Sequence, residues 1–255
     1  MPLRRDGQTR KRWRYVGVYG PDLMLCAARA QVGPFGQCFW GVWDREAQEA
    51  REHTSLRPGS REVTMDGPEI AIEAGAVRVR LRLGEATPIE ARCPSGDSWA
   101  WTRKRAGVPV TGTVEIEGRR REIHGLAVDD ESAGYHRRRT NWHWSAGVGR
   151  ARDGQPVAWN LVEGINDPAR NSERAIWVAG EPSEPAPVSF DGLAGVEFAG
   201  GERLEFASES ERARDDNFLI FRSSYRHRFG TFSGALGELE LAEGFGVMEQ
   251  HDALW

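Results

Sequence analysis

Apolar and polar residues alternate along much of the chain, which is the pattern of a β-strand with one buried and one solvated face. Residues 69–83 alternate on both sides of an Ala74-Gly75 turn, and in the second half valine and leucine alternate with arginine. This predicts a β-hairpin whose arginines lie on the solvated face. Residues 110–123 alternate on both sides of Glu117-Gly118 and predict a second hairpin.

A Trp-x-Trp motif gives a later strand one aromatic face. Trp142 and Trp144 occupy alternate positions, and residues two apart in a strand project to the same side. Thr140 is expected beside them and His143 on the opposite face. An Asp-Gly turn then leads into a second strand, residues 157–163. An aromatic face next to a polar one is typical of the wall of a ligand pocket.

Short strands continue to the end of the chain, separated by thirty glycines and thirteen prolines that are spread rather than clustered. Helical periodicity is weak, and only residues 44–53 are expected to form one short polar helix. Regularly spaced short strands predict an all-β protein of barrels or sandwiches. We expect two packed barrel-type halves, residues 1–125 and residues 126–255, with the Trp-x-Trp motif in the second half.

Composition and charge restrict the classes of partner. A net charge of −4 and a pI near 5.9 give no global basic field for nucleic acid. The basic N-terminal segment lacks the apolar run of a signal peptide, and no stretch is long and apolar enough for a membrane span. Cys26, Cys38 and Cys93 are scattered without a CxxC motif, as in cytoplasmic proteins with reduced thiols. We therefore expect a cytoplasmic protein without an integral membrane segment, and its oligomeric state stays open.

Three adjacent carboxylates, Asp129, Asp130 and Glu131, precede the Trp-x-Trp motif. Neighbours in an extended chain alternate between faces, so Asp129 and Glu131 can converge while Asp130 cannot join them. Enclosed like charges raise at least one pKa, and a protonated carboxylic acid in an apolar pocket can protonate an alkene. We expect Asp129 or Glu131 to be the acid. The alternative is a solvated acidic turn that pairs with the arginines of residues 137–139.

Other candidate residues surround these. His143 is a candidate general base, although a hydrogen-bonded surface histidine is the alternative. Asn160 is a candidate polar anchor for a substrate oxygen, and a hydrogen bond to a loop is its structural alternative. The residues expected to bind the substrate are Trp99, Trp101, Thr140, Trp142, Trp144, Trp159, Asn160 and Glu163. The histidines have no metal-ligand spacing, and phosphate-loop and nucleophile-elbow motifs are absent, so neither a metal nor a cofactor is expected.

Four segments resemble the DUF2804 family, bacterial proteins of unknown function: residues 11–19, 129–149, 159–164 and 246–255. The resemblance runs along nearly the whole chain, and the Trp-x-Trp block is its most specific part. The family usually has a longer segment before the Lys-Arg-Trp motif at residues 11–13. The resemblance therefore implies that a pocket element supplied by that segment is missing here.

More distantly, the chain resembles the two-domain, lipocalin-like (calycin-type) proteins grouped with carotenoid 1,2-hydratases, tocopherol cyclases and certain Diels–Alderases. This analogy of fold implies two lipocalin-like β-barrel halves that enclose an apolar molecule at or between them.

Together these patterns predict a protein that binds a hydrophobic small molecule. The leading hypothesis is cofactor-free acid–base chemistry, namely hydration, cyclisation or pericyclic rearrangement of an isoprenoid- or polyketide-like substrate. Trp142 and Trp144 would stabilise a developing carbocation. Whether the protein is an enzyme stays open, because a carrier of an apolar ligand needs only the aromatic wall. A glycan-binding module is a third hypothesis, and it requires tryptophans on an open face.

Overall fold

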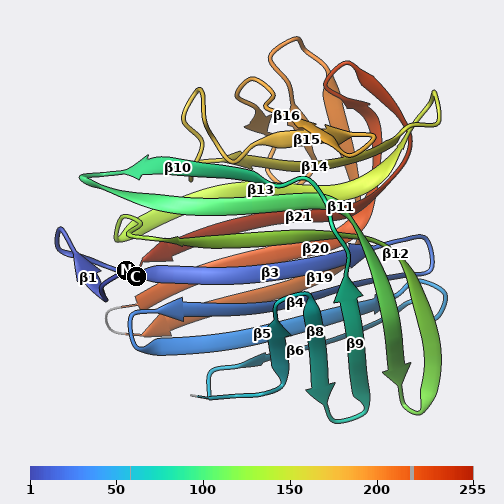
Figure 1. Ribbon diagram of the computed structural model, residues 1–255, viewed down its shortest axis with the longest axis horizontal. Helices are drawn as coiled ribbons and strands as arrows, with labels where there is room; N and C mark the ends of the chain where they lie inside the picture. Colours follow the sequence, from blue (N-terminus) through green and yellow to red (C-terminus); the bar gives the residue numbers. More distant parts are fainter. Residues whose placement is uncertain (58, 219–220, 255) are drawn as a thin grey trace.

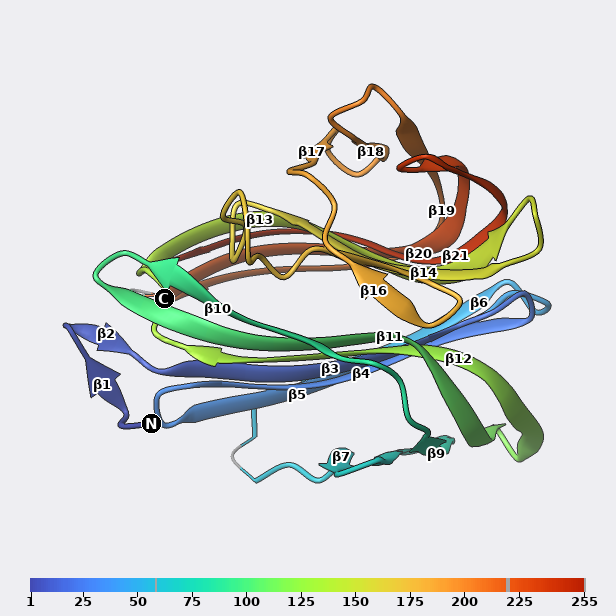
Figure 2. The ribbon, with the colours of Figure 1, turned by 45° about the horizontal axis from the view of Figure 1, so that its top comes forward.

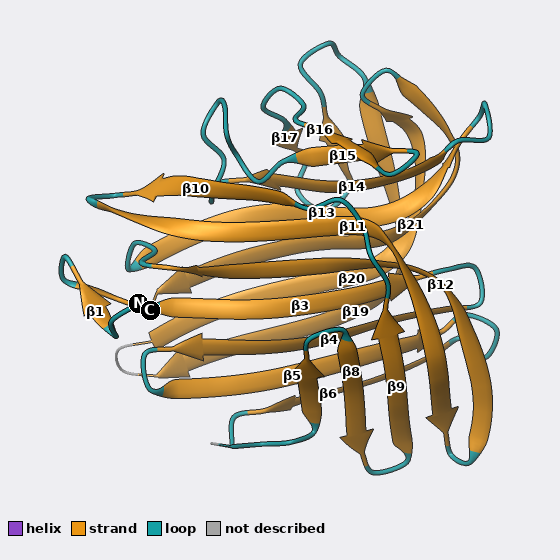
Figure 3. Ribbon diagram, viewed as in Figure 1, coloured by secondary structure: helices purple, strands orange, loops and turns teal. Residues whose placement is uncertain are grey.

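The computed structural model describes residues 1–57, 59–218 and 221–254, and every regular element within them is a β-strand (Figure 1, Figure 3). The expected all-β fold class is confirmed. Trp255, the last residue of the C-terminal motif, lies outside the described residues. So do residues 219–220, within a strand expected from the sequence.

The first large sheet has the order β6-β5-β4-β3-β12-β11-β9-β8-β7, and β10 pairs with the beginning of β11. Its strands are β3 (Lys11–Tyr19), β4 (Leu23–Val32), β5 (Phe35–Asp44), β6 (Glu49–Ser55), β7 (Val63–Asp66), β8 (Glu69–Ala74), β9 (Val77–Leu83), β10 (Ile89–Ser95), β11 (Ser98–Ile116) and β12 (Arg119–Gly134). A separate two-stranded ribbon consists of β1 (Arg4–Arg5) and β2 (Gln8–Thr9).

The second large sheet has the order β16-β15-β14-β13-β21-β20-β19-β18-β17. Its strands are β13 (Arg139–Ala151), β14 (Pro156–Glu163), β15 (Ala175–Val178), β16 (Glu181–Ser183), β17 (Ser189–Phe190), β18 (Gly195–Glu197), β19 (Arg203–Phe218), β20 (Phe221–Leu236) and β21 (Leu239–Leu254).

Each sheet curls over a core of its own, and the sheets pack face to face through a third core (Figure 2). In the first half-barrel, Val16 of β3 packs with Ile72 and Val79 of the strands that curl over it. In the second, Trp159 and Leu204 belong to the equivalent core. The core between the sheets draws on both of them. The expected pair of lipocalin-like barrel halves is confirmed as two strongly curled sheets.

The predicted hairpins form as the alternation indicates. Strands β8 and β9 pair around Ala74, and Glu73 faces Arg78 across the pair. The arginines of β9 lie on the exposed face, where they pair with glutamates. Strands β11 and β12 join through Glu117-Gly118, both with positive φ, as a two-residue hairpin turn requires.

The prediction of a helix at residues 44–53 is wrong. Residues 45–48 form a turn, in which the Asp44 carboxylate accepts a hydrogen bond from the amide of Ala47, and the chain returns as β6. β6 is an edge strand of the first sheet and is exposed along most of its length. Its polar composition therefore reflects a solvated strand rather than a helix.

The change of sheet lies further along the chain than the expected boundary at residue 125. That position falls inside β12, which pairs with β11 along its length and with β3 from Leu126 to Gly134. The first sheet ends with β12 at Gly134, and the second begins with β13 at Arg139. The carboxylate cluster therefore belongs to the first sheet and the Trp-x-Trp motif to the second.

A glycine in the Trp-x-Trp strand makes room for a core tryptophan. Gly147 lies opposite Trp159 in the β13–β14 pair, and the Trp159 indole donates to the hydroxyl of Ser145. A Cβ atom on Gly147 would lie 2.3 Å from Cζ2 of Trp159 and 2.7 Å from the carbonyl oxygen of Phe245. The backbone at this position is thus in direct contact with the indole.

We expect Gly147→Ala to lower the free energy of unfolding by about 1–3 kcal/mol, because a core this tightly packed must shift to admit a methyl group. The matched control is Gly125→Ala in β12, where an added Cβ meets no atom within 4 Å. The control is expected to be neutral or slightly stabilising, because alanine is favoured over glycine in a strand. Urea unfolding of the two variants beside the parent measures both. Equal effects would contradict the close contact.

Candidate functional site

A cavity of about 130 Å³ lies between the two sheets. A single water needs only about 10–15 Å³, so the space admits part of an organic molecule. Trp142 and Trp144 of the second sheet line it, as do Tyr15 and Phe39 of the first. The two tryptophans of the Trp-x-Trp motif therefore point toward the first sheet, on the common face that alternation predicts.

Two rows of directly paired residues meet at this cavity. The first sheet contributes Lys104, Asp130, Tyr15, Ala28 and Phe39, which pair in that order across β11, β12, β3, β4 and β5. The second sheet contributes Val162, Trp144, Glu249, His227 and Arg212, which pair in that order across β14, β13, β21, β20 and β19. Directly paired residues share a face of the sheet, and neighbouring strands lie about 4.8 Å apart, so each row spans about 19 Å.

The aromatic wall is held rigidly. The Trp144 indole donates a 2.8 Å hydrogen bond to the side-chain oxygen of Asn160, and the Tyr15 ring meets it edge-on, with ring centroids 5.2 Å apart. The amide nitrogen of Asn160 donates to the carbonyl oxygen of Glu173. Asn160 therefore lies behind the wall, where it positions Trp144 and the loop that carries Glu173.

Glu249 is a buried carboxyl group in the wall. The Trp142 indole donates to its Oε1 at 2.9 Å, and the Tyr225 hydroxyl donates to its Oε2 at 2.7 Å. Burial raises the pKa of Glu249 to about 7, although both hydrogen bonds act to lower it. Near neutral pH a large fraction of Glu249 is therefore protonated.

A buried cation lies between two carboxylates at one end of the cavity. Lys104 Nζ lies 2.5 Å from Oδ1 of Asp130 and 3.2 Å from Oε2 of Glu173, and the Asn166 amide also donates to Glu173. Burial raises the pKa of both carboxyl groups, against the attraction of Lys104. Burial alone would lower the pKa of Lys104, but the two carboxylates outweigh it and raise that pKa. The cluster therefore holds Lys104 as a stable cation beside two carboxyl groups, Asp130 and Glu173, whose pKa values are raised.

The histidines near the cavity are neutral. Burial lowers the pKa of His251 and of His227 to about 3. His251 shares a 2.7 Å hydrogen bond with the hydroxyl of Ser223, and His227 shares one of 3.0 Å with the hydroxyl of Tyr15. Neutral imidazoles of this kind can orient hydroxyl groups without adding charge to the cavity.

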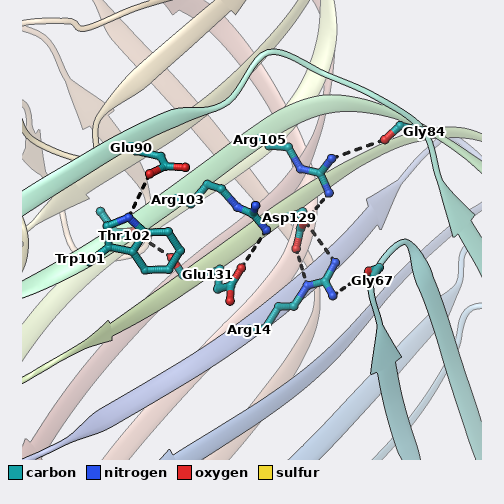
Figure 4. A network of polar contacts seen from close by, with 10 residues as sticks. All are labelled: Arg14, Gly67, Gly84, Glu90, Trp101, Thr102, Arg103, Arg105, Asp129 and Glu131. Atoms are coloured by element: carbon teal, nitrogen blue, oxygen red, sulfur yellow. Dashed lines mark hydrogen bonds and ion pairs between the residues drawn. The ribbon is translucent and has the colours of Figure 1, made fainter. Parts of the chain in front are cut away.

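The structure places Asp129 and Glu131 on the opposite face of β12, outside this cavity (Figure 4). Arg14 and Arg105 both bind the Asp129 carboxylate, at 2.9 and 2.6 Å, and Arg103 binds Glu131 at 2.8 Å. Burial alone would raise the pKa of Asp129, but the two guanidinium groups outweigh it and hold that pKa below its ordinary value. Asp129 is therefore ionised and has no proton to donate. Asp130, which alternation separates from these two, is the carboxylate that lines the cavity.

Three predicted residues lie on the far side of the second sheet. Trp159 is fully buried in the second half-barrel core. The His143 ring stacks on Phe190, and its Nδ1 lies 3.9 Å from Oε2 of Glu163. Glu163 also accepts a hydrogen bond from the amide of Phe190. These three are not brought together with Trp142 and Trp144.

Trp99, Trp101 and Thr140 do not line the cavity either. The Trp101 indole donates to Glu90 on the adjacent strand (Figure 4), and the Arg92 guanidinium lies 4.1 Å from the Trp99 ring centre. Both tryptophans stabilise the β10–β11 hairpin.

Sequence reasoning missed most of the polar groups of the site. The polar residues that line the cavity include Lys104, Asp130, Glu173, Arg212, Tyr225, Glu249 and His251. They come from six separate parts of the chain, so no local motif contains them. One signal was present: Lys104 is the central residue of Arg103-Lys104-Arg105 and lies opposite Asp130, the central residue of the three carboxylates.

Among residues 1–57, 59–218 and 221–254, no group of three or more His, Cys, Asp or Glu side chains is arranged to hold a metal ion. The three cysteines are unpaired and buried. The described residues also contain no helix long and apolar enough to cross a membrane.

We expect Asp129→Asn to lower the free energy of unfolding by about 3 kcal/mol, because it removes the charge that compensates two largely buried guanidinium groups. The matched control is Glu69→Gln, which removes a carboxylate from an exposed pair with Arg82 and should change stability by less than about 0.5 kcal/mol. Urea unfolding at neutral pH compares them. If Asp129→Asn left the free energy of unfolding unchanged, this carboxylate would not have the structural role assigned to it.

Glu249 should make the protein less stable as pH rises. Its folded-state pKa lies above its unfolded value of 4.5, so its contribution is fully present below about pH 4.5 and is lost as pH rises through about 7. The loss is on the order of 3 kcal/mol. We expect Glu249→Gln to weaken the decline in thermal stability between pH 5 and 8. Glu243→Gln, an exposed change on the same strand, should leave it intact. Parallel pH profiles for the parent and Glu249→Gln would contradict the burial of an ionisable carboxyl group.

Comparison with solved structures shows the fold. A putative AttH from Nitrosomonas europaea has 13% sequence identity and a TM-score of 0.65, with 94% of this chain and 92% of that chain covered. Kievitone hydratase from Nectria haematococca has 12% identity and a TM-score of 0.61, with 94% and 88% covered. CghA has 10% identity and a TM-score of 0.55, with 94% and 87% covered. At these identities the likeness concerns the fold alone.

Comparison at the level of sequence is narrower. A search of curated proteins found no match. The profile of the family described as "Domain of unknown function (DUF2804)" matches residues 86–255, which is most of the chain and includes the carboxylate cluster and the Trp-x-Trp motif. The match covers three of the four segments that resemble the family, residues 129–149, 159–164 and 246–255, while residues 11–19 lie outside it. The resemblance is thereby confirmed over residues 86–255, and the chain belongs to the DUF2804 family.

Proposed function

We propose that the protein binds an apolar, unsaturated small molecule between its two sheets and catalyses cofactor-free acid–base chemistry on it, with Glu249 as the acid. The observation that carries this proposal is the position of the Glu249 carboxyl group. It lies in the wall of an aromatic cavity, where the Trp142 indole and the Tyr225 hydroxyl hold it. The similarity of fold to kievitone hydratase supports a hydration reaction.

Glu249 suits the role of a general acid. A pKa near the working pH gives both a substantial protonated fraction and a useful driving force for proton transfer. The proton would pass from the Glu249 carboxyl group to one carbon of a double bond and leave a cation on the neighbouring carbon. Trp142 and Trp144 line the cavity, and their π-electrons would stabilise that cation.

The Lys104 cluster would complete the reaction. In a hydration, the oxygen of a water molecule bonds to the cationic carbon, and the water proton passes to Asp130 or Glu173. Burial raises the pKa of both carboxyl groups and so favours uptake of the proton. In a cyclisation, a second double bond of the substrate bonds to the cationic carbon, and the new carbocation then loses a proton from an adjacent carbon to Asp130 or Glu173. Return of a proton to Glu249 then restores the starting state.

We propose these assignments in place of Asp129, Glu131 and His143 as acid and base, because none of the three lines the cavity. Trp142 and Trp144 keep the role expected from the sequence. Asn160 becomes a positioning residue, since both ends of its amide are engaged by protein groups.

A carrier of an apolar ligand is the second candidate function. It is favoured by the aromatic lining, which provides affinity without chemistry. A carrier predicts that Glu249 is dispensable for ligand affinity and that bound molecules are released unchanged. The third hypothesis, glycan binding, fits less well, because Trp142 and Trp144 lie between the sheets rather than on an open face.

The test is conversion of C10–C20 isoprenoids and polyenes in buffered D2O, with products analysed by mass spectrometry. Because the Glu249 proton exchanges with solvent, its transfer should place deuterium on carbon. In a hydration this deuterium and the added O–D group together raise the mass by one heavy water. We expect Glu249→Gln to lower the rate by about 10²–10⁴-fold. The parent rate should fall as pH rises above about 7, because the acid loses its proton.

The control is Glu243→Gln, an exposed change on the same strand, which should convert substrate at the parent rate. If Glu249→Gln converted substrate at the parent rate, Glu249 would not be the acid. Ligand that binds and is recovered without deuterium would favour the carrier.

A further inference from the structure

The end of the cavity away from Lys104 also carries a buried cation. Arg212 of β19 is 7% exposed and lines the cavity. Its guanidinium carbon lies 4.2 Å from the centre of the Phe39 ring and 5.3 Å from that of Tyr225. Two aromatic rings, one from each sheet, therefore fix the plane of this guanidinium group.

The protein satisfies only part of the guanidinium group. Nε of Arg212 lies 2.6 Å from Oε2 of Glu52, and Nη2 donates to the hydroxyl of Thr54. Nη1 is buried and makes no hydrogen bond to any described residue. Buried polar atoms are nearly always hydrogen-bonded, and an unsatisfied donor is unfavourable. An unsatisfied pair of N–H groups on a side chain that lines a cavity is therefore suited to an oxygen of a bound molecule.

The charges at this end of the cavity balance, so a ligand oxygen that binds here need not carry a charge. Glu52 compensates Arg212, and the neighbouring Arg214 binds both carboxylate oxygens of Asp216. No net positive charge remains to demand an anion. The free N–H groups can donate to a neutral carbonyl oxygen as well as to a carboxylate.

We propose that the ligand is an amphiphile: an apolar, unsaturated body ending in a carbonyl or carboxylate oxygen that accepts hydrogen bonds from Nη1 of Arg212. The apolar body lies along the row toward Trp144. This inference deepens the proposed function, since it concerns the same cavity. It assigns to Arg212 the recognition of the polar end, which is separate from the proton transfer of Glu249.

The position of Arg212 in its row orients the ligand. Glu249 and Arg212 are both directly paired with His227, on β21 and β19 respectively. Two strand spacings of about 4.8 Å separate them, or about 10 Å. When the ligand oxygen binds Arg212, the carbon that lies about 10 Å further along the ligand is therefore next to Glu249.

Isothermal titration calorimetry with a matched C10 series tests the proposal. Geranic acid and geranial carry the acceptor oxygen, and myrcene is a hydrocarbon of the same carbon number. The parent is expected to bind the acid or the aldehyde at least tenfold more tightly than myrcene. Arg212→Gln should abolish this preference and leave the affinity for myrcene within about twofold.

Two further variants separate recognition from packing. Arg212→Lys keeps the charge beside Glu52 but lacks the forked N–H groups, so it should fold like the parent and still lose the preference. Arg226→Gln removes an exposed arginine that pairs with Asp215, and it should keep the preference. Circular dichroism confirms folding of each variant.

Equal affinity of the parent for all three compounds, or no binding of the acid and the aldehyde, overturns the proposal. So does an Arg212→Lys variant that binds with the parent's preference. A uniform loss of affinity for all three compounds in both Arg212 variants would show a packing role instead, and also overturns it.

Glu249→Gln separates this inference from the proposed function. If the preference depends on Arg212 and conversion in D2O does not depend on Glu249, the proposed chemistry fails and the recognition stands.

Discussion

The strands at the centre of each sheet are buried on both faces, and the rest of the structure depends on this constraint. In β3, Val16 faces the first half-barrel core, while Tyr15 and Tyr19 face the second sheet. A polar side chain on either face cannot reach water and needs a partner within the protein. Asp129 and Asp130 illustrate this, because these adjacent residues point to opposite faces and each meets a cation there. The acidic cluster is thus a set of separate ion pairs on the two faces of β12 rather than one acidic surface.

Small side chains of the first sheet are part of the cavity wall. Protein interiors are normally close-packed, so space between two sheets requires small residues opposite large ones. Ala28 and Ala30 in the first sheet provide this space beside the rings of Trp142 and Trp144. The polar groups that border the space are held by neighbouring residues rather than by solvent. Such groups keep their orientation when a ligand replaces water, which is the preorganisation that catalysis in an apolar site requires.

Alternation along single strands predicted the hairpins and the common face of Trp142 and Trp144, because that information is local. The pairing of Lys104 with Asp130 depends on the register of two long strands, and a register shift between Ala106 and Val108 separates it from the predicted end of that hairpin. Glu249 and Arg212 come together only through a third strand between them. The polar edge strand β6 resembles a helix in composition, and only its pairing with β5 distinguishes the two.

The division of roles between the sheets bears on the choice between enzyme and carrier. The proposed acid, Glu249, and the proposed oxygen anchor, Arg212, both lie on the second sheet, whereas the Lys104–Asp130 pair and the rings of Tyr15 and Phe39 lie on the first. A ligand between them would be fixed at one end and surrounded along its length. A carrier gains affinity from the rings alone, and a buried carboxyl group that ionises near neutral pH weakens the stability of the protein above that pH. Retaining Glu249 in the wall is therefore costly without a chemical role, and this argues for catalysis over storage.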